Sequence, residues 1–437
     1  MSSESRGHIA SRVVRPTRRG LAIGIAGVVV LIPAYLFHRT ELMFLGWFGV
    51  LLLAAALVLV AVRRLRIDVT RTFSHAMLVA GHASVCELEL RNLSPYATAE
   101  AHWQEVLPWH PVLTPPERLA PIPGRITSRT MPVRILRYEI VPPRRGRFQI
   151  GPLLIEVTDP FGLAKCVTAV GDTELVTVIP QIEHLTQGGL SMTADDGAAS
   201  VQRLRALGGD DDVMTRSYRT GDALRRVHWR ASAHRGELMV REEEQRSHAE
   251  ARIVLDTSRR GYSDRRGSAE PYQARSGVTT GDEAQSERFE WTLKLAATLA
   301  LHLEQRGFLV QIAETAPRQL TAPDRVDEFL ESVAAISLVP RSGPLDESML
   351  PDTHPDRTLG MIFAMIADAE PVTIESLVAQ RTQFGLAVAI VVSPRPDEAM
   401  ERLESAGWLC IAAPPAESVV PLWQSIAPLV ESNRAAR

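Results

Sequence analysis

Residues 20–37 read GLAIGIAGVVVLIPAYLF and residues 42–62 read LMFLGWFGVLLLAAALVLVAV. Each run is nearly continuous in apolar residues and is long enough to cross about 30 Å of hydrocarbon as an α-helix. Only residues 38–41 lie between the two runs, so the two helices must be antiparallel. The sequence therefore predicts a transmembrane hairpin at about 20–37 and 42–62, within a basic first segment at 1–66.

Arginine flanks this hairpin on both sides. Five arginines precede the first run and three follow the second, whereas the turn holds one arginine beside Glu41. The positive-inside rule then predicts that both ends lie in the cytoplasm. A cleaved signal peptide is the alternative, which is disfavoured by the length of the first run, the lack of an A-x-A-like site in the turn, and the second run. The flanking arginines are Arg6, Arg12, Arg15, Arg18, Arg19, Arg63, Arg64 and Arg66.

Length and composition bound the rest of the chain. Its 437 residues exceed what one hydrophobic core usually serves, so several domains are expected. A net charge of −3 weighs against a dedicated nucleic-acid binder, and no nucleic-acid partner is expected. Cys86, Cys166 and Cys410 lie far apart with no C-x-x-C pair, which favours reduced thiols over disulfides or a zinc site.

Residues 67–180 show short alternating stretches, as at 85–90 and 153–158. Turn-forming residues interrupt these stretches at 92–95 and 142–146, and no amphipathic helix of normal length can be drawn. This pattern predicts a β-sandwich domain, for which an immunoglobulin-like topology is expected.

From residue 251 the pattern alternates between apolar strands and helical periodicity, which is typical of a parallel sheet with helices on both faces. A doubly wound α/β domain is predicted at 251–437, with a mobile insertion at about 259–287 that is rich in Ser, Gly, Arg and Glu. The expected strands are at 251–255, 308–312, 361–366, 386–392 and 408–411, and the expected helices are at 289–305, 374–383 and 418–431.

The connector at 181–250 holds the densest cluster of functional groups, at 215–242, and arginine dominates it. Guanidinium groups bind carboxylates and phosphates in pairs of hydrogen bonds, so this segment could bind an anionic ligand or an acidic partner. The residues by themselves favour a structural interpretation, a polar brace between two domains in which Asp222, Glu237 and Glu242 pair with the arginines of the same segment. His228 and His234 lack further converging ligands, so neither is predicted to bind a metal, and no catalytic residue is predicted.

A second candidate site follows the first expected strand of the α/β domain. Asp256 and Ser258 lie at its carboxyl end, where open parallel sheets place their ligand crevices, and Asp368 follows a later strand. Carboxylate and hydroxyl oxygens are ligands for hard cations. Asp256, Ser258 and Asp368 are therefore candidate ligands for Mg²⁺ or Mn²⁺. The alternative is a chance pattern with no bound metal, because short Asp-x-Ser sequences are common.

The connector resembles the bacterial domain of unknown function 58 family, whose members carry a von Willebrand factor type A-like domain. The β-domain stretch at 145–163, with its Asp159-Pro160-Phe161-Gly162-Leu163 sequence, is similar to that family's pattern, and so is the N-terminal helix pair. The matching connector residues, which are also the candidate partner- or anion-binding residues, are Arg216, Tyr218, Arg219, Gly221, Asp222, Arg225, His228, Trp229 and Arg230.

The resemblance implies a multi-pass protein of the bacterial cytoplasmic (inner) membrane, with soluble domains facing the cytoplasm and a MoxR-type AAA+ ATPase as partner. It also implies an Asp-x-Ser-x-Ser metal motif, of which Asp256 and Ser258 match two positions. Arg260 stands at the third position, where its charge opposes a cation, so a degenerate metal site is expected.

The functional expectation is a non-enzymatic, membrane-anchored interaction protein. The alternative is a metal-dependent hydrolase or transferase acting on an anionic substrate. A third possibility is a protein that binds nucleic acid or anionic lipid through the connector arginines. Binding that weakens as the salt concentration rises would distinguish this possibility from the other two.

Overall fold

The computed structural model describes most of the chain, in two compact units. One unit ends at Ile179 and the other begins at Pro180. The described residues are 12–109, 115–126, 133–185, 215–218, 227, 229–241, 250–262, 286–340, 359–392, 397–415 and 418–435.

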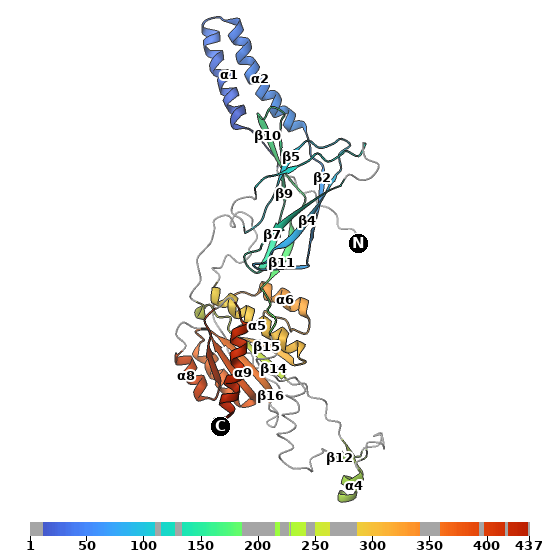
Figure 1. Ribbon diagram of the computed structural model, residues 1–437, viewed down its shortest axis with the longest axis vertical. Coiled ribbons are helices and arrows are strands. Elements are labelled where there is room, and N and C mark those ends of the chain that lie inside the picture. The colour runs from blue at the N-terminus through green and yellow to red at the C-terminus, as the bar shows by residue number, and fades with distance from the viewer. Residues whose placement is uncertain are drawn as a thin grey trace. The chain divides into compact units, whose positions relative to one another are not determined.

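Two helices form the predicted hairpin: α1 (Arg18–Leu36) and α2 (Thr40–Val62) (Figure 1). Both are long and apolar enough to cross a membrane, and only 17% of the most apolar window of each is buried. Glycines let the two helices approach closely, since a Cβ added at Gly27 would lie 2.9 Å from the Gly46 carbonyl oxygen. Despite this close packing, most of the apolar surface of the hairpin is exposed.

As the alternating pattern predicts, the described part of 67–180 contains strands and no helix. The sheet β2-β4-β7 and the sheet β1-β10-β9-β5-β6 contribute side chains to one hydrophobic cluster, so the two sheets pack face to face. The immunoglobulin-like topology stays a prediction. The strands are β1 (Arg12–Pro16), β2 (Ile67–Phe73), β3 (Met77–Val79), β4 (Ser84–Asn92), β5 (Ala101–Glu105), β6 (Glu117–Leu119), β7 (Val133–Ile140), β8 (Gly146–Ile150), β9 (Leu153–Thr158), β10 (Ala164–Val170) and β11 (Glu174–Ile179).

Strand β1 was not expected from the sequence, which suggested only a basic segment before the hairpin. It pairs antiparallel with β10, so the chain enters the β-domain before it forms the helices and returns to it through β2 afterwards. Arg12 strengthens this junction, because its Nη2 donates to the carbonyl oxygens of Val60 at 2.6 Å and Arg63 at 2.8 Å. Both ends of the hairpin are thus fixed to one domain.

The β9–β10 turn receives the first turn of α1. The Asp159 carboxylate, in a residue that is 5% exposed, accepts from the backbone N–H groups of Phe161, Leu163 and Ala164 at 2.8, 2.7 and 2.5 Å. In the turn so formed, the carbonyl oxygens of Gly162 and Leu163 accept from the hydroxyl and the N–H of Thr17 at 2.6 and 2.8 Å.

Thr17 is also the N-cap of α1, since its Oγ1 accepts from the Gly20 N–H at 3.1 Å. A Cβ at Gly20 would collide with the Leu163 carbonyl, so only glycine allows this approach. The turn therefore determines where the hairpin begins and how close it lies to the β-domain.

The second unit contains a five-stranded parallel sheet in the order β15-β14-β16-β17-β18, as the alternating pattern predicted. Helices α6 and α8 were not among the helices expected from the sequence, whereas α7, which is as short as α6, was. The elements are β14 (Glu250–Leu255), α5 (Glu287–Gln305), β15 (Leu309–Glu314), α6 (Val326–Ala335), β16 (Leu359–Ile366), α7 (Pro371–Gln380), β17 (Phe384–Val391), α8 (Asp397–Ser405), β18 (Leu409–Ala412) and α9 (Val420–Ala435).

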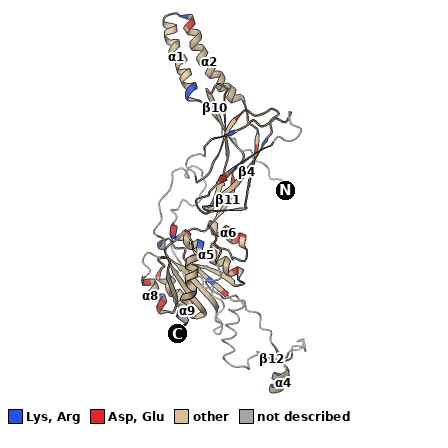
Figure 2. Cartoon of the chain, in the orientation of Figure 1, with Lys and Arg blue, Asp and Glu red and all other residues tan. Residues whose placement is uncertain are grey.

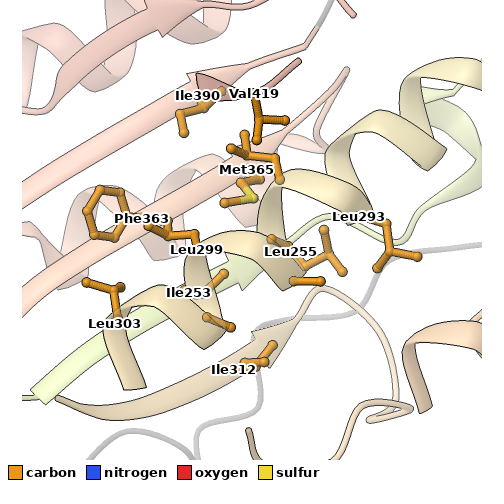
Figure 3. Packing of buried hydrophobic residues seen from close by; sticks show 14 of the residues in the cluster. Ile253, Leu255, Leu293, Leu299, Leu303, Ile312, Phe363, Met365, Ile390 and Val419 are labelled. Carbon is orange, nitrogen blue, oxygen red and sulfur yellow. The ribbon is translucent and has the colours of Figure 1, made fainter. Parts of the chain in front are cut away.

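Helices cover both faces of this sheet. Ile253 and Leu255 of β14 pack in a cluster with α5, α6 and α9, and Figure 3 shows them beside Phe363 and Met365 of β16. Val254, which points the other way, packs in a separate cluster with α7 and α8. Strands buried on both faces give the nearly continuous apolar runs that the sequence shows, and the unit is doubly wound.

We expect the Asp159→Ala variant to lose about 3–5 kcal/mol of unfolding free energy, because three N–H groups lose a charged acceptor. Denaturant unfolding of the full chain in detergent measures the loss. Asp172→Ala is the control, since residue 172 is exposed. Equal losses in the two variants would contradict the role given to Asp159.

Candidate functional site

The arginine-rich connector forms a small β-hairpin with one short helix. Strand β12 (Thr215–Ser217) pairs antiparallel with β13 (Met239–Arg241), and α4 (Trp229–Arg235) lies between them in sequence. The Ser232 hydroxyl accepts from the Met239 N–H at 2.8 Å, which ties α4 to β13.

The connector residues predicted to bind a partner or an anion are only partly described. Trp229 is 68% exposed and Tyr218 is half-buried. Glu237 is exposed and forms no ion pair with a described residue, whereas Asp222 and Glu242 lie outside the described residues, so the polar brace stays untested. Also outside them are Arg219, Gly221, Arg225 and His228, together with the side chains of Arg216 and Arg230.

The second candidate site lies at the carboxyl edge of the parallel sheet. Asp256 follows β14 and Asp368 follows β16, which is the neighbouring strand, so both lie at the same edge. Thr315 follows β15, on the other side of β14. From β14 the chain crosses to β15 on one side and later to β16 on the other, which makes this edge the topological switch point of the sheet.

Asp256 is the most constrained residue at this edge and is 1% exposed. Its Oδ1 accepts from the Ser258 N–H at 3.0 Å and from the Thr315 hydroxyl at 2.9 Å. Its Oδ2 is buried without a hydrogen-bond partner among the described residues. Burial raises the pKa of this carboxyl, although the Ser258 and Thr315 hydrogen bonds act in the opposite direction.

A short 3-10 helix, η2 (Arg259–Gly261), covers Asp256. Ser258 is 1% exposed and caps η2, because its Oγ accepts from the Arg260 N–H at 3.4 Å. A Cβ added at Gly261 would lie 3.2 Å from Asp256 Oδ2 and 2.8 Å from Ala367 Cβ. The start of the predicted mobile insertion is therefore packed against the sheet, and residues 263–285 lie outside the described residues.

The residues at this edge do not fit a bound Mg²⁺ or Mn²⁺ in this arrangement. The Asp256 Oδ2 atom, which has no hydrogen-bond partner among the described residues, is by its chemistry a suitable ligand. However, η2 covers this oxygen, and a hard cation needs about six oxygen ligands. The Ser258 hydroxyl already caps η2, and Asp368 and Arg260 are exposed. Within the described ranges, no group of three or more His, Cys, Asp or Glu could hold a metal ion.

Glu314, at the end of β15, belongs to this edge and was missed by the sequence analysis. Its Oε1 accepts from the N–H groups of Gln319 at 2.7 Å and Leu320 at 2.8 Å, and the residue is 6% exposed. Burial raises the pKa of its carboxyl, against the effect of those two hydrogen bonds. The sequence feature that could have indicated this residue is a glutamate at the end of an apolar strand. In the structure, the Glu314 side chain holds the loop that follows Thr315.

One family model matches this chain: residues 214–276 match the family described as Protein of unknown function DUF58. The match covers most of the connector described above and reaches Asp256 and η2, which supports the family resemblance. No curated protein matches.

Solved structures give weak likenesses. The CARDB domain of a Pyrococcus furiosus protein, in complex with di-metal ions, is 11% identical over 26% of this chain and 88% of that chain, with a TM-score of 0.19. A Paenibacillus cycloisomaltooligosaccharide glucanotransferase is 12% identical over 75% of this chain and 53% of that chain, with a TM-score of 0.17. Bacillus subtilis Spo0M, a sporulation control protein, is 9% identical over 32% of this chain and 55% of that chain, with a TM-score of 0.13. At these TM-scores no functional argument follows.

We expect Glu314→Gln to remove a pH dependence of stability. Because the folded pKa of Glu314 is raised, the folded protein keeps a proton that the unfolded chain has lost, and the unfolding free energy falls as pH rises from the usual glutamate pKa through the raised value. The glutamine keeps the acceptor for both N–H groups and has no such loss.

The variant should therefore melt higher than the wild type at about pH 8 and match it at about pH 4, in thermal scans of the full chain. Glu375→Gln, at an exposed position of α7, is the matched control and should follow the wild type at both values. A constant difference between Glu314→Gln and the wild type across this range would contradict the assignment.

Calorimetry tests whether the covered Asp256 carboxylate can bind a metal ion. We expect titration of the full chain with Mg²⁺ or Mn²⁺ to give no heat that depends on Asp256, because η2 blocks direct coordination. Asp256→Ala should therefore match the wild type. Saturable binding that Asp256→Ala abolishes and Glu375→Ala retains would show instead that η2 opens and that the metal site is functional.

Proposed function

We propose that this chain is a non-enzymatic interaction protein, anchored in the bacterial cytoplasmic membrane by α1 and α2, whose second unit binds a cytoplasmic protein. A MoxR-type AAA+ ATPase is the partner that the family resemblance suggests. The exposed apolar surface of the hairpin is the observation that supports membrane anchoring. Apolar helices in the core of a soluble protein are mostly buried, whereas only 17% of the most apolar window of each of these helices is buried.

The β-domain supports a hairpin with both ends on one side of the bilayer. Strand β1 enters α1, strand β2 follows α2, and both strands belong to the same domain. Cleavage after the first helix would remove β1 from its sheet, which argues against a signal peptide. With arginines at both ends, the positive-inside rule favours the cytoplasmic side for these ends.

The architecture of the second unit supports the binding role. The sheet order has a switch point between β14 and β16, where doubly wound proteins bind their ligands. This order is compatible with a von Willebrand factor type A-like domain, in which the same edge carries the ligand site. The exposed Asp368 and Trp229 are groups that a partner could contact at this edge and in the connector.

The alternative function, a metal-dependent hydrolase or transferase, requires an accessible cation beside Asp256. The covering of that carboxylate by η2 favours the binding role over the enzymatic one. A turnover that depends on both Asp256 and added metal would reverse this preference.

Binding to a purified MoxR-type ATPase from the same organism tests the proposal. The full chain in lipid nanodiscs is immobilised, and the ATPase is titrated over it. We expect saturable binding that Asp368→Arg weakens about tenfold or more, since a reversed charge in a contact typically costs more than 1.4 kcal/mol.

Glu375→Arg is the matched control, because it reverses an exposed charge on α7 and should leave the affinity unchanged. Absence of saturable binding by the wild-type chain would refute this ATPase as the partner. Equal weakening by both variants would move the contact away from the carboxyl edge.

A further inference from the structure

The end of the β-domain nearest the hairpin exposes large apolar side chains on loops. Phe161, in the β9–β10 turn, is 67% exposed, and Tyr96 and Ile126 are 73% and 74% exposed. Leu93 is 42% exposed. Single exposed apolar side chains are common in soluble proteins, whereas several gathered at one end of a domain mark a candidate interaction surface.

Backbone hydrogen bonds place these loops beside the hairpin. Phe161 precedes Gly162, whose carbonyl oxygen accepts from Thr17, and α1 starts at the next residue, Arg18. The Leu93 N–H donates to the carbonyl oxygen of Arg66, which lies four residues after the end of α2.

The remaining two apolar side chains belong to the same group of loops. The Ile126 N–H donates to the Pro95 carbonyl oxygen at 3.2 Å, and the Arg125 N–H donates to the Ser94 carbonyl oxygen at 3.1 Å. This pairs the loop of Ile126 with the loop of Leu93 and Tyr96, so all four side chains lie at the end of the domain from which the helices leave.

Exposed arginines dominate the charge at this end. In residues 12–19, 63–68, 93–100, 123–126 and 159–163, the exposed acidic residues are Asp68 and Glu100, and the buried Asp159 carboxylate is occupied by backbone N–H groups. Figure 2 shows basic residues at the end of α1 that adjoins the β-domain. The exposed arginines are Arg15, Arg18, Arg19, Arg63, Arg64, Arg66 and Arg125.

We propose that this end of the β-domain is a membrane-binding face, at which Phe161, Tyr96, Leu93 and Ile126 enter the interfacial region of an anionic bilayer while the arginines bind lipid phosphates. The inference rests on the proposed membrane anchoring, because the hairpin is what brings this end to the bilayer. It adds that the β-domain itself lies on the lipid surface and does not hang from a loose tether.

The chemistry of the face matches that of a lipid surface. Aromatic and aliphatic side chains are stable at the boundary between headgroups and acyl chains, and each arginine near an anionic leaflet adds a favourable electrostatic contribution. The Thr17 and Gly20 contacts hold Phe161 at the level where α1 begins, so insertion needs no rearrangement of the turn.

Labels on the full chain in vesicles test this face. Cysteine variants Phe161→Cys and Tyr96→Cys are labelled with an environment-sensitive fluorophore, in a Cys410→Ser background that leaves only the buried Cys86 and Cys166. The vesicles are equimolar phosphatidylcholine and phosphatidylglycerol and contain a lipid-borne nitroxide quencher.

Two further label sites make the outcomes distinct. Val85→Cys is the matched control, because Val85 is 47% exposed and lies at the other end of β4, about 25 Å from Leu93 along the strand. Phe48→Cys, at a 64% exposed position of α2, reports on the hairpin.

We expect quenching at residues 48, 161 and 96 and none at residue 85, and weaker quenching at 161 and 96 in pure phosphatidylcholine. Quenching at 48 but not at 161 and 96 would overturn the membrane-binding face and leave the anchor intact. No quenching at 48 would overturn the anchor itself. Equal quenching at 161 and 96 in both lipid mixtures would overturn the role given to the arginines.

Discussion

The carboxylate of Asp159 is the constraint on which the first unit depends. By accepting three backbone N–H groups, it folds the β9–β10 turn so that two carbonyl oxygens face Thr17. Thr17 then caps α1, and Gly20 allows the helix to pack on the Leu163 backbone. One buried charge, satisfied by backbone donors, thus joins a helical hairpin to a β-domain without a flexible linker. The exposed Phe161 is carried by the same turn, so the proposed membrane contact depends on that carboxylate as well.

In the second unit, the comparable constraint is the parallel sheet that is buried on both faces. Its strand order places Asp256, Thr315 and Asp368 at one edge, where η2 covers the Asp256 carboxylate. Asp256 is held by Ser258 and Thr315 beneath η2, while Glu314 fixes the loop after β15. Buried carboxylates that accept backbone N–H groups therefore organise both units: Asp159 supports the junction with the helical hairpin in one, and Asp256 and Glu314 support the carboxyl edge of the sheet in the other.

These arrangements bear on how the proposed functions fit together. In the proposed anchoring, a hairpin that leaves and re-enters one β-domain would hold that domain against the bilayer, and the arginines at the junction would have two compatible roles. They would orient the hairpin during insertion and then lie where lipid phosphates are available. The proposed binding edge belongs to the other unit, where η2 covers the carboxylate that would hold a metal ion.

The sequence by itself determined the elements that depend on local periodicity: the two apolar helices, the alternating strands of the β-domain, and the repeating strand–helix pattern of the α/β unit. These follow from runs of neighbouring residues, and so does the placement of Asp256 at a strand end. Only the tertiary structure decided that β1 joins the β-domain, that Gly261 packs over Asp256, and that Glu314 holds the loop beside it. The physical reason is that these features arise from contacts between residues far apart in sequence, such as Thr17 with Leu163 and Asp256 with Thr315, which no local pattern encodes.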